Sequence, residues 1–106
     1  MPNKTWKQVE RNVAKKIGGV RNSLSGKNSK ITSGDVIHDI FYIEVKHRKK
    51  IPFYAEFKKT MKKAKKEGRM PMVVIHEKFS RNYIVMIDLN NLGTLLNGYD
   101  KIIIDK

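Results

Sequence analysis

Two carboxylates and a lysine stand near one another in the chain, at Asp35, Glu44 and Lys46. Carboxylate oxygens are the hard ligands that Mg²⁺ prefers, and one or two of them suffice when water and a backbone carbonyl complete the shell. A nearby lysine can hold or activate a water and counter developing negative charge. These residue types could therefore hydrolyse a phosphodiester with Mg²⁺, or with Mn²⁺ as a substitute. The alternative is a solvated ion pair between Glu44 and Lys46 on an exposed strand.

The residues from Phe41 to Lys46 predict a β-strand that aligns two of these groups. They are rich in β-branched and aromatic types, and a period of two separates Phe41, Ile43 and Val45 from Tyr42, Glu44 and Lys46. Asp35 begins a preceding strand, and His38-Asp39 predicts the turn between the two. Asp39 is a rival ligand, although aspartate in a turn commonly bonds its own backbone.

A further carboxylate, Glu10, falls within a helix predicted from Thr5 to Ile17. Thr5 suits the N-cap, Gly18-Gly19 predicts the end, and apolar residues recur at helical spacing at Trp6, Val9, Val13 and Ile17. On a helical wheel, Glu10 lies beside this apolar stripe, whereas the basic residues lie further toward solvent: Lys7, Arg11 and Lys15. We therefore expect Glu10 at the margin of the core.

The rest of the chain alternates between strand and helix patterns. We predict strands at 20–24, 72–76, 83–87 and 102–104, and an exposed loop at 25–33. A helix is predicted from Pro52 to about Glu67, where Gly68 ends it. A short helix is predicted from Asp88, which caps it, to Leu96. The second helix is expected to bury Phe53, Phe57, Met61 and Ala64 and to expose its lysines. This order predicts an α/β or α+β fold with a mixed sheet.

Composition predicts one folded domain, residues 1–106, with a polyanion as its partner. Twenty-three Lys and Arg against ten Asp and Glu give a net charge of +13, which favours nucleic acid over the alternative of an anionic membrane surface. The absence of cysteine excludes thiolate metal sites and fits a reducing interior. No stretch has the length of a signal-peptide core or a membrane span, so we expect a soluble cytoplasmic protein.

Basic residues gather where the strand that carries Glu44 ends. The run His47, Arg48, Lys49 and Lys50 predicts contacts with the DNA backbone, and Arg21, Lys27 and Lys30 are weaker candidates of the same kind. The histidines show no spacing for a zinc site. Among the aromatic residues, Tyr54 could stack on a base, whereas the spacing of Trp6, Phe53 and Phe57 predicts core positions.

Two segments resemble the PD-(D/E)xK nuclease superfamily: Ser33-Gly34-Asp35 and the run from Tyr42 to Lys50, which reads YIEVKHRKK. Within that superfamily, the chain is most similar to archaeal-type Holliday junction resolvases and their phage-encoded relatives. The similarity covers nearly the whole chain and implies a restriction-endonuclease-like core, a mixed β-sheet flanked by helices. Two departures are Gly34, where the family name has proline, and a short segment between Asp35 and Glu44.

The resemblance also implies roles for individual residues. Asp35 and Glu44 would be metal ligands together with the Val45 carbonyl, Lys46 would be the catalytic lysine, and Glu10 would complete the acidic cluster. Resolvases of this type use a serine in the loop before the aspartate, for which Ser25 and Ser33 both remain candidates.

The expected function is therefore a Mg²⁺-dependent DNA endonuclease, a homodimeric resolvase of four-way junctions that needs no small-molecule cofactor. If it is encoded by a phage, it would act in the cytoplasm of the host cell. Two alternatives remain open. One is a nuclease of the same fold that cuts nicked, flapped or linear DNA, and the other is a basic DNA-binding protein without activity.

Overall fold

The computed structural model describes residues 2–23, 31–48, 52–78 and 80–104, without the side chains of 2–4, 48 and 99–104. In this part of the chain, five strands form one mixed sheet in the order β1-β2-β3-β4-β5. The elements are α1 (Pro2–Ile17), β1 (Val20–Arg21), β2 (Val36–Ile37), β3 (Phe41–Arg48), α2 (Phe53–Glu67), β4 (Met70–Glu77), β5 (Tyr83–Ile87) and α3 (Leu89–Ile104). Only the β3–β4 pair is parallel, because α2 crosses over between these strands.

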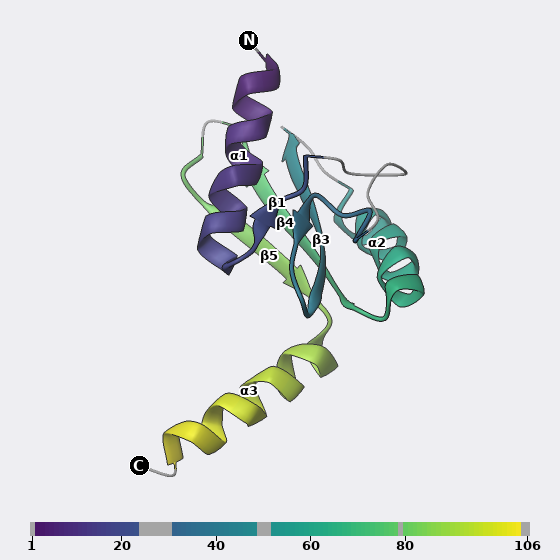
Figure 1. The fold of residues 1–106 in the computed structure, drawn as a ribbon, viewed down its shortest axis with the longest axis vertical. Helices are drawn as coiled ribbons and strands as arrows, with labels where there is room; N and C mark the ends of the chain where they lie inside the picture. The colour runs from purple at the N-terminus through teal and green to yellow at the C-terminus, as the bar shows by residue number, and fades with distance from the viewer. Residues whose placement is uncertain (1, 24–30, 49–51, 79, 105–106) are drawn as a thin grey trace.

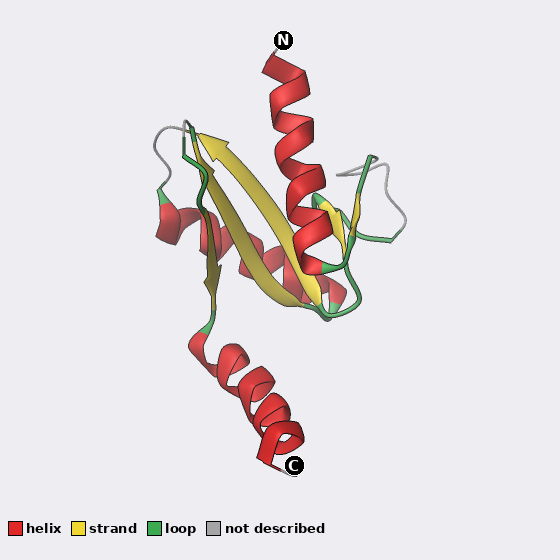
Figure 2. Ribbon diagram, turned by 90° about the vertical axis from the view of Figure 1, so that its left-hand side faces the viewer, coloured by secondary structure: helices red, strands yellow, loops and turns green. Residues whose placement is uncertain are grey.

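Helices cover both faces of this sheet (Figures 1 and 2). On the α1 face, Val9 and Val13 pack against Phe41, Ile43 and Val45 of β3 in the main hydrophobic cluster. On the other face, α2 contributes a smaller cluster in which Phe57 packs against two residues of β4, Val73 and Ile75. The predicted period of two in β3 is thus confirmed, and Glu44 and Lys46 point to the α2 side.

Local sequence signals set most element ends as predicted. Gly18 and Gly68, with φ of 83° and 67°, follow α1 and α2 in the left-handed conformation that glycine adopts without strain. The His38 ring accepts hydrogen bonds from the backbone nitrogens of Ile40 and Phe41 at 3.0 and 3.3 Å, which fixes the β2–β3 turn. Asp88 caps α3 through its side chain.

Three predictions about the elements are wrong. Residues 102–104 belong to α3 and not to a strand, because the helix continues through Asn97-Gly98 and leads away from the sheet edge at β5 (Figure 1). β1 ends at Arg21, so the predicted strand at 20–24 is shorter than expected. α1 begins at Pro2, before Thr5.

Three residues predicted to be core are exposed: Trp6 by 40%, Phe53 by 49% and Met61 by 43%. Trp6 lies near the N-terminal end of α1, and this end of the helix extends beyond the strands (Figure 2). Phe53 is the first residue of α2 and therefore also lies at the N-terminal end of its helix. Helical spacing identifies a face of the helix, but it does not say how much of that face reaches the sheet.

Among the described residues, no helix is both long and apolar enough to cross a membrane.

Candidate active site

Asp35 is fixed at the point where the β2–β3 ladder stops. Its backbone nitrogen donates to Ile43 O at 2.8 Å, and its Oδ2 accepts from Val45 N at 2.8 Å. Because β2 has only two residues, the Asp35 side chain takes over the pairing of β3. The N–H and C=O of one strand residue point to the same edge, so the Val45 carbonyl faces the side on which Asp35 lies.

The backbone before Asp35 runs too close to β3 for a side chain. A Cβ added at Gly34 would lie 2.9 Å from Ile43 O and 3.3 Å from Ile43 N. Gly34 is therefore required by a close backbone approach.

Two polar side chains that sequence analysis did not single out hold the segment 32–34 in place. Asn22 Nδ2 donates to Thr32 O and Gly34 O, each at 2.9 Å. Glu67 Oε1 accepts from Thr32 Oγ1 at 2.6 Å, while Glu67 Oε2 accepts from Ser33 N and Ser33 Oγ at 2.9 and 3.2 Å. The available signal for Glu67 was an acidic residue in the last turn of a lysine-rich helix, where the helix dipole disfavours negative charge.

The hydrogen bonds to Glu67 also affect its ionisation. Burial alone would raise the pKa of Glu67, but the donors from Thr32, Ser33 and Arg69 together lower it below the ordinary 4.5. The carboxylate is therefore held in its charged form.

Lys46 lies between two carboxylates. Its Nζ is 3.9 Å from Glu44 Oε2 and 3.3 Å from Glu56 Oε2 on α2. Glu56 is buried, with 8% of the residue exposed, and its role was missed because it appeared only as part of an otherwise basic helix. On the other side of Glu44, Tyr42 OH donates to Glu44 Oε1 at 3.2 Å.

Asp35 and Glu44 form an acidic pair. Burial raises the pKa of Glu44 to about 7, and the charge of Asp35 adds to the rise. Burial also raises the pKa of Asp35, although the hydrogen bond from Val45 N opposes this. A divalent cation bound beside the two carboxyl groups would oppose these rises in pKa, because it would favour the charged form of both.

Glu10 is more deeply buried than its predicted position at the margin of the core, since only 1% of it is exposed. Arg21 Nε donates to Glu10 Oε1 at 2.8 Å, so this predicted DNA-binding arginine is engaged with an acid. Burial raises the pKa of Glu10 despite Arg21, and the negative charge of Glu10 in turn raises the pKa of Asp35. Within the described residues, Glu10 Oε2 is buried without a hydrogen-bond partner.

A polar pocket of about 250 Å³, here called the acidic pocket, is lined by Trp6, Asp35, Glu44, Val45, Lys46 and His47. Glu10 is not among these lining residues. Trp6 is the unexpected member, since the sequence predicted it to be core.

His47 is oriented by a second histidine. His76 Nε2 lies 2.8 Å from Ser80 O, and because a carbonyl only accepts, that nitrogen carries the hydrogen. The Nδ1 atoms of His47 and His76 lie 2.7 Å apart, so one ring donates to the other there. Burial, followed by the charge of His76, lowers the pKa of His47. Its neutral form is therefore favoured.

The donor set fits a cation that keeps much of its water. Among the described residues, no three His, Cys, Asp or Glu side chains come together as a ready-made ligand group. Mg²⁺ needs only one or two carboxylates besides carbonyl oxygen and water. Asp35, Glu44 and the Val45 carbonyl meet this requirement, and the unpartnered Glu10 Oε2 is a buried acceptor suited to metal-bound water.

The other predicted residues divide into two groups. Asp39 is exposed on the β2–β3 turn and does not line the pocket. Ser33 Oγ is 2.8 Å from Tyr42 OH and also contacts Glu67. Six of the predicted DNA contacts lie outside the described residues or side chains: Ser25, Lys27, Lys30, Arg48, Lys49 and Lys50.

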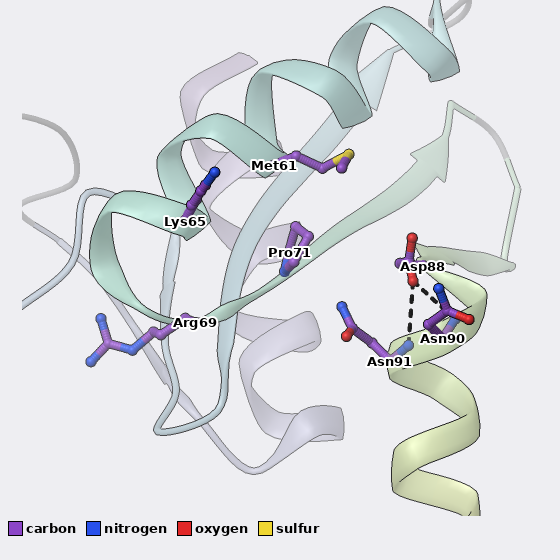
Figure 3. Close-up of a pocket in the computed structure, with 7 residues that line it drawn as sticks. All are labelled: Met61, Lys65, Arg69, Pro71, Asp88, Asn90 and Asn91. Carbon is purple, nitrogen blue, oxygen red and sulfur yellow. Dashed lines mark hydrogen bonds between the residues drawn. The ribbon is translucent and has the colours of Figure 1, made fainter.

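A second hollow of about 400 Å³ shares no residue with the acidic pocket (Figure 3). Its lining comes from α2, the start of β4 and the start of α3: Met61, Lys65, Arg69, Pro71, Asp88, Asn90 and Asn91. Asp88 Oδ1 already accepts from the backbone nitrogens of Asn90 and Asn91 at 2.9 and 3.3 Å. The hollow accounts for the exposure of Met61.

Comparison of the chain with protein-family models, with curated proteins and with solved structures gave no match.

Proposed function

We propose that this protein is a Mg²⁺-dependent endonuclease that hydrolyses phosphodiester bonds in DNA, with a four-way junction as its preferred substrate. The observation that carries the proposal is the meeting of Asp35, Glu44 and Lys46 in one polar pocket. The net charge of +13 supports a polyanionic substrate. Mn²⁺ is expected to replace Mg²⁺, because both bind carboxylate and water oxygens.

Four residues of the pocket and the buried Glu10 have roles in this proposal. Asp35, Glu44 and the Val45 carbonyl would hold the ion, which would supply an acidified water and neutralise charge on the phosphate. Lys46, held by Glu56 at 3.3 Å, would place its ammonium group beside the negative charge that develops. Glu10 would accept a hydrogen bond from metal-bound water through its unpartnered Oε2.

We include a restriction-endonuclease-like core in the proposal. It is supported by the sequence resemblance and by three features of the fold: α1 covers one face of a mixed sheet, Asp35 precedes β2, and the Glu44-x-Lys46 pair lies on β3. We further propose a homodimer, because two symmetric cuts in one junction need two sites and a closed two-fold dimer provides them. Light scattering on the purified protein tests this, and a monomer at the concentration used for cleavage would contradict it.

The decisive experiment measures cleavage of labelled junction, flap, nicked and linear DNA with Mg²⁺ or with chelator. Asp35→Asn and Lys46→Ala should each abolish metal-dependent cutting while DNA binding persists. Asp39→Asn is the matched control, because it makes the same chemical change at an exposed turn carboxylate outside the pocket.

Each outcome separates one alternative. Paired symmetric nicks confined to the junction support a resolvase, whereas cutting of flap, nicked or linear DNA assigns a simpler substrate to the same chemistry. Binding without metal-dependent cutting of any substrate would refute the enzyme and leave a DNA-binding protein. Normal cutting by Asp35→Asn together with loss in Asp39→Asn would refute the ligand assignment.

A further inference from the structure

Trp6 is placed where an aromatic ring could contact a substrate. It lines the acidic pocket together with Asp35 and Glu44, and 40% of the residue is exposed. It stands four residues before Glu10 on α1, and side chains at that spacing lie on the same side of a helix. The indole therefore lies on the side of α1 that carries the buried acid.

Neither packing nor hydrogen bonding accounts for this position. The residues of α1 in the main hydrophobic cluster are Val9, Val13 and Ala14, and Trp6 is not among them. Within the described part of the chain, the Trp6 side chain makes no hydrogen bond and no ring contact, whereas the other aromatic ring of the pocket, His47, is stacked on His76. Trp6 is the aromatic side chain of the pocket that remains available to a ligand.

We propose that Trp6 is a base-stacking platform and that the preferred DNA carries an unpaired or unstacked base next to the cut phosphate. This inference rests on the proposed nuclease function and deepens it by naming the substrate class. Aromatic side chains stack on any base, because every base has a π-face. Inside an intact duplex, both faces of each base are covered by its neighbours, whereas a branch point or a gap leaves one face free.

The fluorescence of Trp6 allows a direct test of the proposal. Trp6 is the single tryptophan, so fluorescence excited at a wavelength that tyrosine does not absorb reports on this side chain alone. The full-length protein is titrated in chelator, where cutting cannot occur, with a four-way junction, a duplex that contains a two-nucleotide gap, and an intact duplex of equal length. Anisotropy of labelled DNA measures saturation independently.

Stacking predicts quenching of Trp6 by the junction and the gapped duplex at saturation, with little change on the intact duplex. No change in emission with any saturating DNA would overturn the proposal, and so would equal quenching by the intact duplex. A change in emission with protein concentration in the absence of DNA would also overturn it, because it would place Trp6 in a contact between two copies.

Variants test the same contact by affinity. Trp6→Leu keeps an apolar side chain without a π-face and should weaken junction binding by about tenfold while intact-duplex binding stays the same. Trp6→Phe should retain most of the junction affinity. Circular dichroism checks that both variants fold, and an unchanged ratio of junction to duplex affinity in Trp6→Leu would refute the platform.

The two proposals fail in different ways. Cutting of junctions with a silent Trp6 would refute the stacking contact alone. Quenching by junctions with no metal-dependent cutting would refute the nuclease and leave a structure-selective DNA-binding protein.

Discussion

Replacing Glu67 with glutamine should loosen the segment that carries Asp35. Glu67 accepts four hydrogen bonds, from Thr32 Oγ1, from the nitrogen and hydroxyl of Ser33, and from Arg69 Nη1. A glutamine side chain keeps one oxygen, which can still accept two of these four hydrogen bonds. Its NH₂ group takes the place of the other oxygen and faces two donors, which lose their acceptor. Each donor that loses its acceptor costs about 1–3 kcal/mol. The Glu67 side chain is 21% exposed, so water can replace part of the lost hydrogen bonding. We therefore expect the free energy of unfolding to fall by roughly 2 kcal/mol.

The loss should also depend on pH in a defined direction. The folded state lowers the pKa of Glu67 below 4.5, so its carboxylate stabilises the fold above the unfolded value and loses this effect as the pH falls through the folded value. Once Glu67 is protonated, it resembles glutamine. The difference between wild type and Glu67→Gln should therefore be largest at neutral pH and should shrink below pH 4.5.

Urea unfolding followed by circular dichroism measures both effects. Glu77→Gln is the matched control, since it makes the same change at an exposed residue at the end of β4. It should alter the unfolding free energy by less than about 0.5 kcal/mol. A Glu67→Gln variant as stable as this control at neutral pH would refute the reasoning, and so would a loss that is the same in acid.

Three further predictions concern the site and its substrate. Gly34→Ala should destabilise the fold by about 1–3 kcal/mol, because its Cβ would lie 2.9 Å from Ile43 O, whereas Gly98→Ala in open space on α3 should be neutral or stabilising by urea unfolding. Glu56→Gln should slow single-turnover cleavage without weakening DNA binding, because it removes the carboxylate 3.3 Å from Lys46; an unchanged rate would show that this ion pair does not position the lysine. DNA affinity should fall linearly with salt on logarithmic axes, and a flat dependence measured by anisotropy would contradict binding through many phosphates.

Local patterns in the sequence predicted the elements that carry the site. The alternation in β3 correctly put Glu44 and Lys46 on one face, since the period of two is a property of any strand. The glycines after α1 and α2 predicted the helix ends, because left-handed backbone favours glycine wherever it occurs. These signals depend on neighbours within a few residues, which the sequence contains in full.

Contacts between distant segments were decided by the tertiary structure. The closeness of Glu56 to Lys46, and of Glu67 to the segment before Asp35, follows from the way α2 crosses the sheet. The helical spacing that predicted a core position for Trp6 could not show that α1 extends past the strands and brings the indole to the pocket. Residues 102–104 suit a strand by composition, yet a strand needs a partner edge, and α3 leads away from the sheet. Sequence supplied the chemical groups, and packing over long separations decided which of them meet.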